Sequence, residues 1–181
     1  MKKLVLFGDS IRMGYEPEVR EILKDAWEVY GPPENGRFSA YTLNSIRFWV
    51  NDMPEADVVH FNCGLWDMGD DNGFGRPFTR PAEYKENLEL IIRVIRKHYP
   101  EAKIAMATTT PTRDRDQKII REYNEILKQV AEEQHIPVDD LYTLFAGKED
   151  RYLSLDNLHF TKEGFRYAAE HVAGFVENLM K

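Results

Sequence analysis

The feature that most constrains the fold is a regular alternation of short apolar runs, rich in β-forming residues, with longer amphipathic runs. The spacing predicts strands at Lys3–Phe7, Trp27–Tyr30, Asp57–Asn62 and Lys103–Thr108, with a weaker one at Pro137–Val138. It predicts helices at Glu16–Asp25, Ala40–Asn51, Ala82–His98, Asp116–Gln134 and Lys162–Met180. Strands that alternate with helices form a parallel sheet covered on both faces. The sequence therefore predicts a three-layer α/β/α sandwich around a parallel sheet of about five strands.

Length and charge narrow the class of protein. A chain of 181 residues favours one domain over residues 1–181. Its 31 acidic and 24 basic residues give a formal charge of -7, which argues against nucleic acid or an anionic membrane surface as a partner. The sequence does not specify whether the chain forms homo-oligomers.

The expected location is the cytoplasm. The apolar run that begins the chain ends at Phe7, which is too short for a secretory signal, and no stretch is long enough to span a bilayer. Cys63 is the single cysteine, so an intrachain disulfide is impossible and a reducing compartment is the simplest expectation.

Chemistry-bearing residues follow the predicted strands. Ser10 comes after the first strand, Gly36 after the second, residues 64–67 after the third and residues 109–113 after the fourth. The carboxyl ends of parallel strands lie at the same edge of a sheet, where ligands bind in this class of fold. The sequence thus predicts a functional site built from these loops.

Two short motifs at opposite ends of the chain suggest the chemistry of that site. Phe7-Gly8-Asp9-Ser10 follows the first strand, and Asp156-Asn157-Leu158-His159 precedes the last helix. A serine hydroxyl is a weak nucleophile until a base removes its proton, and a carboxylate can hold a histidine in the tautomer that this base requires. We predict a serine hydrolase with Ser10 as nucleophile, His159 as base and Asp156 as its partner.

Each residue also has a structural alternative. Ser10 could cap a helix, Asp156 could form a turn, and His159 could lie at the surface or cap a helix end. Three such residues in a suitable order, at the two ends of an alternating α/β chain, favour the catalytic interpretation. The other histidines have no motif around them and are expected to be structural or solvated.

From Leu4 to about Ala173, the chain resembles the SGNH hydrolases, the GDSL-type esterases and lipases with a flavodoxin-like fold. The resemblance rests on Gly8-Asp9-Ser10, on Gly36, on Gly64-Leu65-Trp66-Asp67, and on Asp156 with His159. It implies that the backbone N–H groups of Ser10 and Gly36, together with an asparagine side chain, stabilise the oxyanion formed when an ester is attacked. No zinc, dinucleotide or Walker-type motif is present in the sequence, so no metal or other cofactor is expected.

The third block departs from the family pattern because Trp66 occupies the place of the asparagine. The Trp66 indole N–H could act as the replacement donor, or Asn62 at the end of the strand could reach the same point. Alternatively, Trp66 forms a wall of the acyl pocket, or only two backbone donors remain and catalysis is weakened.

The substrate prediction rests on the loop from Cys63 to Pro81, which mixes aromatic and basic side chains. This character favours a small acyl ester, with acetyl as the expected acyl group and a carbohydrate as the candidate alcohol. The alternatives are a catalytically impaired member of the family that binds a ligand, and a flavodoxin-type ligand-binding protein. Asp9 argues against the latter because its carboxylate would repel a bound phosphate.

Overall fold

The computed structural model describes residues 1–71 and 73–181, and its centre is a five-stranded sheet in the order β2-β1-β3-β4-β5. Every neighbouring pair is parallel. The strands are β1 (Lys2–Phe7), β2 (Trp27–Tyr30), β3 (Val58–Asn62), β4 (Lys103–Ala107) and β5 (Val138–Asp139). Each lies within one residue of its predicted bounds at either end, and the predicted parallel sheet is confirmed.

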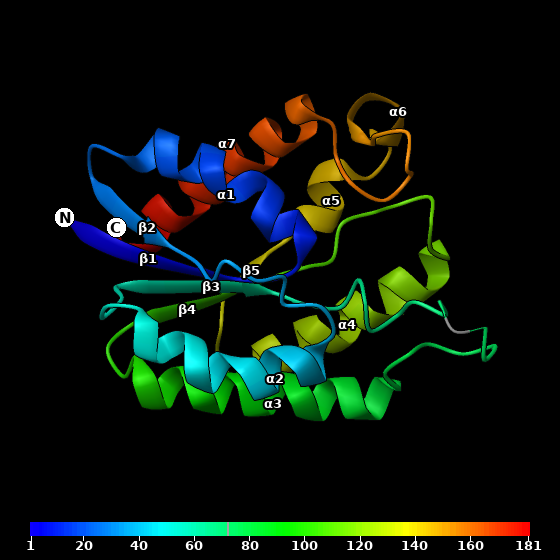
Figure 1. Ribbon diagram of the computed structural model, residues 1–181, viewed down its shortest axis with the longest axis horizontal. Helices are drawn as coiled ribbons and strands as arrows, with labels where there is room; N and C mark the ends of the chain where they lie inside the picture. Colours follow the sequence, from blue (N-terminus) through cyan, green and yellow to red (C-terminus); the bar gives the residue numbers. More distant parts are fainter. Residues whose placement is uncertain (72) are drawn as a thin grey trace.

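Helices cover both faces of the sheet (Figure 1). On one side lie α1 (Ser10–Leu23) and α7 (Lys162–Leu179). On the other lie α2 (Ser39–Trp49), which continues as a 3-10 turn over Val50–Asp52, then α3 (Pro81–His98) and α4 (Gln117–Glu133). The predicted three-layer α/β/α architecture is thus confirmed. The sequence did not predict two short helices between β5 and α7, α5 (Leu141–Phe145) and α6 (Glu149–Tyr152).

Strand β1 shows how the two layers of core arise. Successive side chains of a strand point to opposite faces, so Val5 and Phe7 join the apolar cluster under α2, α3 and α4, whereas Leu4 and Leu6 join the cluster under α1 and α7. All four are fully buried. This explains why the strand reads as a continuous apolar run, which is typical of the centre of a parallel sheet.

The start of the first helix was predicted wrongly. The helix begins at Ser10, six residues before the expected Glu16, because the Asp9 carboxylate caps it by accepting the Ile11 N–H at 2.9 Å. Pro17 consequently lies inside the helix instead of in its first turn. It lies on the exposed side, where water can satisfy the carbonyl that proline leaves without a donor.

Helices α1 and α7 pack directly on each other, which brings the two ends of the chain together. A Cβ at Gly14 would collide with the ring of Phe165, so glycine at this position allows the close approach. Among the described residues, no helix is long and apolar enough to cross a membrane.

Candidate active site

Ser10 lies where β1 ends and α1 begins. Residues 8–9 form the turn between them, and Ser10 is the first residue of the helix. In the part of the chain that the structure describes, the Ser10 N–H has no hydrogen-bond acceptor, as expected for the first turn of a helix. The serine thus combines a partly exposed hydroxyl with an available backbone donor at the positive end of a helix.

The structure brings the three residues of the predicted triad into one hydrogen-bonded chain. His159 Nε2 lies 2.9 Å from Ser10 Oγ, and His159 Nδ1 lies 2.7 Å from Asp156 Oδ2. The second oxygen, Asp156 Oδ1, accepts the N–H groups of Leu158 and His159, both at 2.9 Å, and the Ser154 hydroxyl at 2.7 Å. These donors, with the Leu158 N–H contributing most, hold the pKa of Asp156 well below its usual range. The carboxylate therefore stays ionised while it orients the imidazole.

The loop that carries the histidine is held by the loop that follows β4. The Asn157 carbonyl accepts the Arg113 N–H at 2.9 Å, the Asp114 N–H at 3.2 Å and the Thr112 hydroxyl at 2.5 Å. Asn157 has a positive φ of 62°, a conformation that asparagine tolerates better than most residues. The sequence gave no signal for this clamp, which fixes the turn between Asp156 and His159.

Gly36 lies against the turn of residues 8–9 that precedes Ser10. Its N–H donates to the Gly8 carbonyl at 2.9 Å, and a Cβ added to Gly36 would lie 2.7 Å from that same oxygen. The glycine is therefore required by close backbone approach. Because its N–H is engaged by Gly8, the assignment of Gly36 as an oxyanion donor stays a prediction.

Asn62 and Trp66, the two alternatives for the third oxyanion donor, occupy different surroundings. Asn62 is buried beneath the turn of residues 8–9, so close that a Cβ at Gly8 would collide with its side-chain oxygen. Trp66 is 39% exposed on the loop after β3. These observations do not show the side-chain N–H of either residue directed at the position of an oxyanion, so both assignments stay predictions.

Sequence reasoning missed the role of Asp67. This fully buried carboxylate accepts the Ser39 N–H at 2.9 and 3.0 Å and the Ser39 hydroxyl at 2.5 Å, so it ties the loop after β3 to the first turn of α2. Burial raises the pKa of Asp67 despite these donors. The available signal was an aspartate in the third block and a serine at the start of a predicted helix.

A second aspartate–histidine network lies inside the molecule. Asp139 at the end of β5 receives His60 Nε2 from β3 at 2.9 Å and His171 Nε2 from α7 at 2.8 Å. Asp139 and His60 are fully buried, whereas the His171 side chain is 36% exposed. Burial acts to raise the pKa of Asp139, but the hydrogen bonds from His171 and His60 outweigh it and lower that pKa. The hydrogen bond between Asp139 and His171 in turn raises the pKa of His171.

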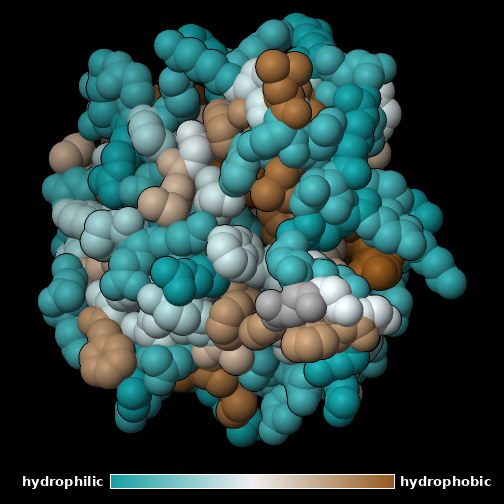
Figure 2. Space-filling view, turned by 45° about the vertical axis from the view of Figure 1, so that its right-hand side comes forward, coloured by the Kyte–Doolittle hydropathy of each residue, from teal (hydrophilic) through white to brown (hydrophobic). Residues whose placement is uncertain are grey.

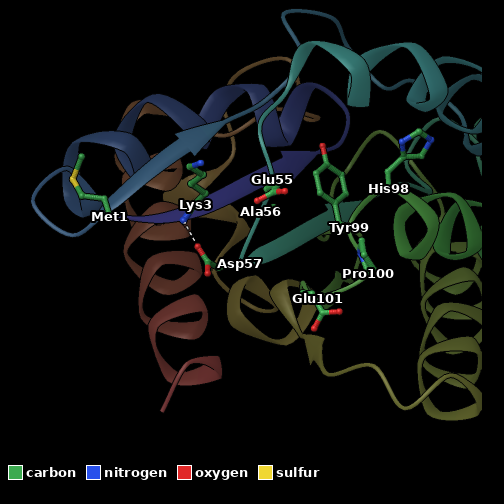
Figure 3. A pocket seen from close by; sticks show the side chains of 9 residues that line it. All are labelled: Met1, Lys3, Glu55, Ala56, Asp57, His98, Tyr99, Pro100 and Glu101. Atoms are coloured by element: carbon green, nitrogen blue, oxygen red, sulfur yellow. Dashed lines mark hydrogen bonds between the residues drawn. The ribbon is translucent and has the colours of Figure 1, made fainter.

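A roomy pocket of about 400 Å³ lies at the opposite edge of the sheet from Ser10 (Figure 3). Its walls include Lys3 at the start of β1, Asp57 just before β3 and Glu101 just before β4. The Asp57 carboxylate accepts a hydrogen bond from the Lys3 N–H at 2.6 Å. Ligand sites in such sheets lie at the carboxyl ends of the strands, so this pocket is not the candidate active site. Among the described residues, no group of three or more His, Cys, Asp or Glu is placed to hold a metal ion.

Comparisons with known proteins identify the class. The model of the GDSL-like Lipase/Acylhydrolase family matches residues 6–167. No curated protein matches the chain. The chain thus belongs to the GDSL-like lipase/acylhydrolase family, a class of carboxylic ester hydrolases.

Solved structures with the same fold cover nearly the whole chain. An acetyl xylan esterase, AlAXEase, is 22% identical with a TM-score of 0.80, and the match covers 96% of this chain and 99% of that one. A lipase/acylhydrolase from Enterococcus faecalis is 24% identical with a TM-score of 0.79, covering 98% and 96%. A carbohydrate esterase of family 3 from Talaromyces cellulolyticus is 19% identical with a TM-score of 0.79, covering 99% and 98%.

Proposed function

We propose that the protein is a serine esterase that removes a small acyl group, with acetyl as the expected group, from an alcohol such as a carbohydrate. The observation that carries this proposal is the hydrogen-bonded chain from Ser10 Oγ through His159 to Asp156, with distances of 2.9 and 2.7 Å. This is the arrangement that an activated serine requires, with the nucleophile bound to its base and the base oriented by a carboxylate.

The reaction proceeds in two halves. His159 Nε2 takes the Ser10 proton as Oγ attacks the acyl carbon, and the imidazolium that forms is stabilised by Asp156. The tetrahedral oxyanion is received by the Ser10 N–H, with Gly36 as the second backbone donor. His159 returns the proton to the leaving alcohol, which produces an acyl-enzyme, and then activates a water molecule that releases the acid and restores Ser10.

The surface around the site supports a small acyl group. Trp66, Phe74, Phe78 and Leu155 expose apolar side chains on the loops at this edge. Figure 2, which turns this edge of the molecule forward, shows hydrophobic residues in several separate places among hydrophilic ones. An enzyme that works on a lipid surface would need a larger continuous apolar area. The names of two structural neighbours, an acetyl xylan esterase and a carbohydrate esterase, support the same class of substrate.

The test combines covalent labelling with an ester series. A fluorophosphonate probe should label the wild type and leave Ser10→Ala unlabelled. With p-nitrophenyl esters, kcat/KM should be highest for acetyl and fall as the acyl chain lengthens, and acetylated sugars should release acetate. We expect Ser10→Ala to lose at least about 10⁴-fold in kcat/KM.

Two outcomes would count against the proposal. A folded wild-type protein that the probe does not label would favour the catalytically impaired, ligand-binding alternative. A preference for long-chain over acetyl esters would leave the chemistry intact but overturn the proposed acyl group.

A further inference from the structure

Arg12, two residues after the nucleophile, has one of the largest side chains that are completely buried in the molecule, with 2% exposure. An arginine is almost never fully buried unless its charge is paired. Glu16, one turn further along α1, supplies the opposite charge at 2.5 Å. The ion pair with Glu16 does not by itself explain why Arg12 is buried, because the guanidinium also binds groups outside α1.

Three of its hydrogen bonds reach backbone carbonyls, two in the loop after β2 and one in the turn that precedes Ser10. Arg12 Nη1 donates to the Pro32 carbonyl at 3.0 Å, and Nη2 donates to the Glu34 carbonyl at 2.6 Å. Nη2 also lies 3.4 Å from the Gly8 carbonyl, in the turn that presents Ser10. One planar group therefore joins the loop of residues 31–36 to the turn of residues 8–9.

The Gly8 carbonyl is the point where the two segments meet. It accepts the Gly36 N–H at 2.9 Å from the end of that loop, in addition to the longer contact from Arg12. The Gly36 carbonyl is held in turn by the Thr42 hydroxyl of α2 at 2.7 Å. The N–H of Gly36 is thus tied to the Gly8 carbonyl that Arg12 also contacts, and the carbonyl of Gly36, in the next peptide group, is tied to Thr42.

We propose that Arg12 is a positioning residue that sets the Gly36 N–H beside Ser10 for stabilisation of the oxyanion. This inference rests on the proposed function. In the resting structure the Gly36 N–H is bound to Gly8, and it becomes available to an oxyanion only if it leaves that carbonyl. Arg12 Nη2 already lies at the same oxygen and takes over as its donor, so a buried carbonyl is not left unsatisfied.

The role requires an arginine. Its rigid fork serves four acceptors at once, whereas a lysine ammonium on a flexible stem retains the charge but cannot reach the same set. Arg20 provides a matched control on the same helix. It binds the same Glu16, at 2.5 Å, and the Val29 carbonyl of β2, but it has no hydrogen bond to the 31–36 loop or to Gly8.

The experiment compares Arg12→Lys with Arg20→Lys on p-nitrophenyl acetate, measuring kcat and KM separately and the rate of fluorophosphonate labelling. We expect kcat of Arg12→Lys to fall by about 10- to 100-fold, with KM within about threefold, because a misplaced donor acts on the transition state. Arg20→Lys should keep kcat within about twofold. A purely structural role for Arg12 would instead lower the melting temperature of Arg12→Lys and leave kcat of its folded fraction unchanged.

A second pair of variants keeps the test decisive if Arg12→Lys does not fold. Thr42→Val removes the hydroxyl that holds the Gly36 carbonyl, and Thr42→Ser restores it, so kcat should fall by about 10-fold in the first and recover in the second. A kcat equal to that of the wild type in Arg12→Lys, or in Thr42→Val where Arg12→Lys does not fold, would overturn the inference. A wild type that the probe does not label would instead signal failure of the proposed esterase function.

Discussion

The described part of the chain contains two aspartate–histidine groups, one at the edge of the sheet and one in its interior. At the edge, one nitrogen of His159 faces the Asp156 carboxylate and the other faces the Ser10 hydroxyl. In the buried network, Asp139 instead binds a histidine through each of its two oxygens, and no serine takes part. The two carboxylates also differ in exposure: the side chain of Asp156 is 51% exposed and that of Asp139 is fully buried.

The comparison teaches that an aspartate–histidine contact does not by itself mark an active site. Asp139 joins β5, β3 and α7, so its hydrogen bonds connect three elements of the core. Among the residues that the structure describes, the Asp156 carboxylate binds only groups of its own turn, namely local N–H and O–H donors and one imidazole. We therefore expect substitutions of Asp156 to affect catalysis and those of Asp139 to affect stability.

The largest effect should come from Asp156→Asn. The asparagine oxygen can still accept the local N–H groups, which turns its NH₂ group towards His159 Nδ1 and selects the tautomer that is protonated on Nε2. That tautomer cannot take the Ser10 proton, so kcat/KM should fall by about 10⁴-fold. Thermal unfolding should change little, because the side chain is exposed. A kcat/KM within tenfold of the wild type would remove Asp156 from the catalytic group.

Asp139→Asn should produce the reverse result. Its NH₂ group would face an imidazole N–H, and the buried His60 would lose its charged acceptor. We expect a loss of about 2 to 4 kcal/mol in the free energy of unfolding, measured by urea denaturation. Active-site titration with the fluorophosphonate should show unchanged kcat per folded molecule. A variant as stable as the wild type but with low kcat would mean that the buried network serves the reaction.

The smallest effect concerns the pH dependence of stability. Asp139 raises the pKa of His171 in the folded state, so protonation of His171 stabilises the fold fully below its unfolded pKa of about 6.5, and this stabilisation is lost as the pH rises through the folded value. The stability difference between wild type and His171→Gln should therefore be larger at pH 6 than at pH 8. We expect the change to be about 0.5 kcal/mol, because solvent screens the partly exposed imidazole. Urea denaturation at both pH values measures it, and an equal difference at both would show that His171 contributes only a neutral hydrogen bond.

Much of the fold was predictable because local patterns reflect the final environment. The buried strands read as apolar runs, and α3 and α4 show apolar residues at helical spacing, so their bounds were predicted within one residue. The prediction failed at the start of α1, where Gly14 is unfavourable in a helix and Pro17 is typical of a first turn, until the Asp9 cap and the packing of Phe165 are known. The short α5 and α6 have too few residues to show a period.

The candidate site divides in the same way. Ser10, Asp156 and His159 were chosen from the sequence because each predicted role requires a particular functional group. Functional groups can be read directly from the residue types. The contacts that hold them were not visible: Arg12 to the Gly8 carbonyl, Thr112 to the Asn157 carbonyl, and Asp67 to Ser39. Two of these three involve backbone carbonyls, which every residue possesses and which no sequence pattern marks.

The sequence by itself thus determined the alternating α/β layers and the membership of an ester-hydrolase family, and it supplied the predicted nucleophile with its predicted partners. The tertiary structure alone decided that the Gly36 N–H is bound to Gly8 in the resting state, and that His60 and His171 form a network with Asp139. The physical reason is the distance along the sequence over which each property is set. Periodicity and functional groups are local properties of a chain, whereas these contacts join segments whose relative placement depends on how the whole core packs.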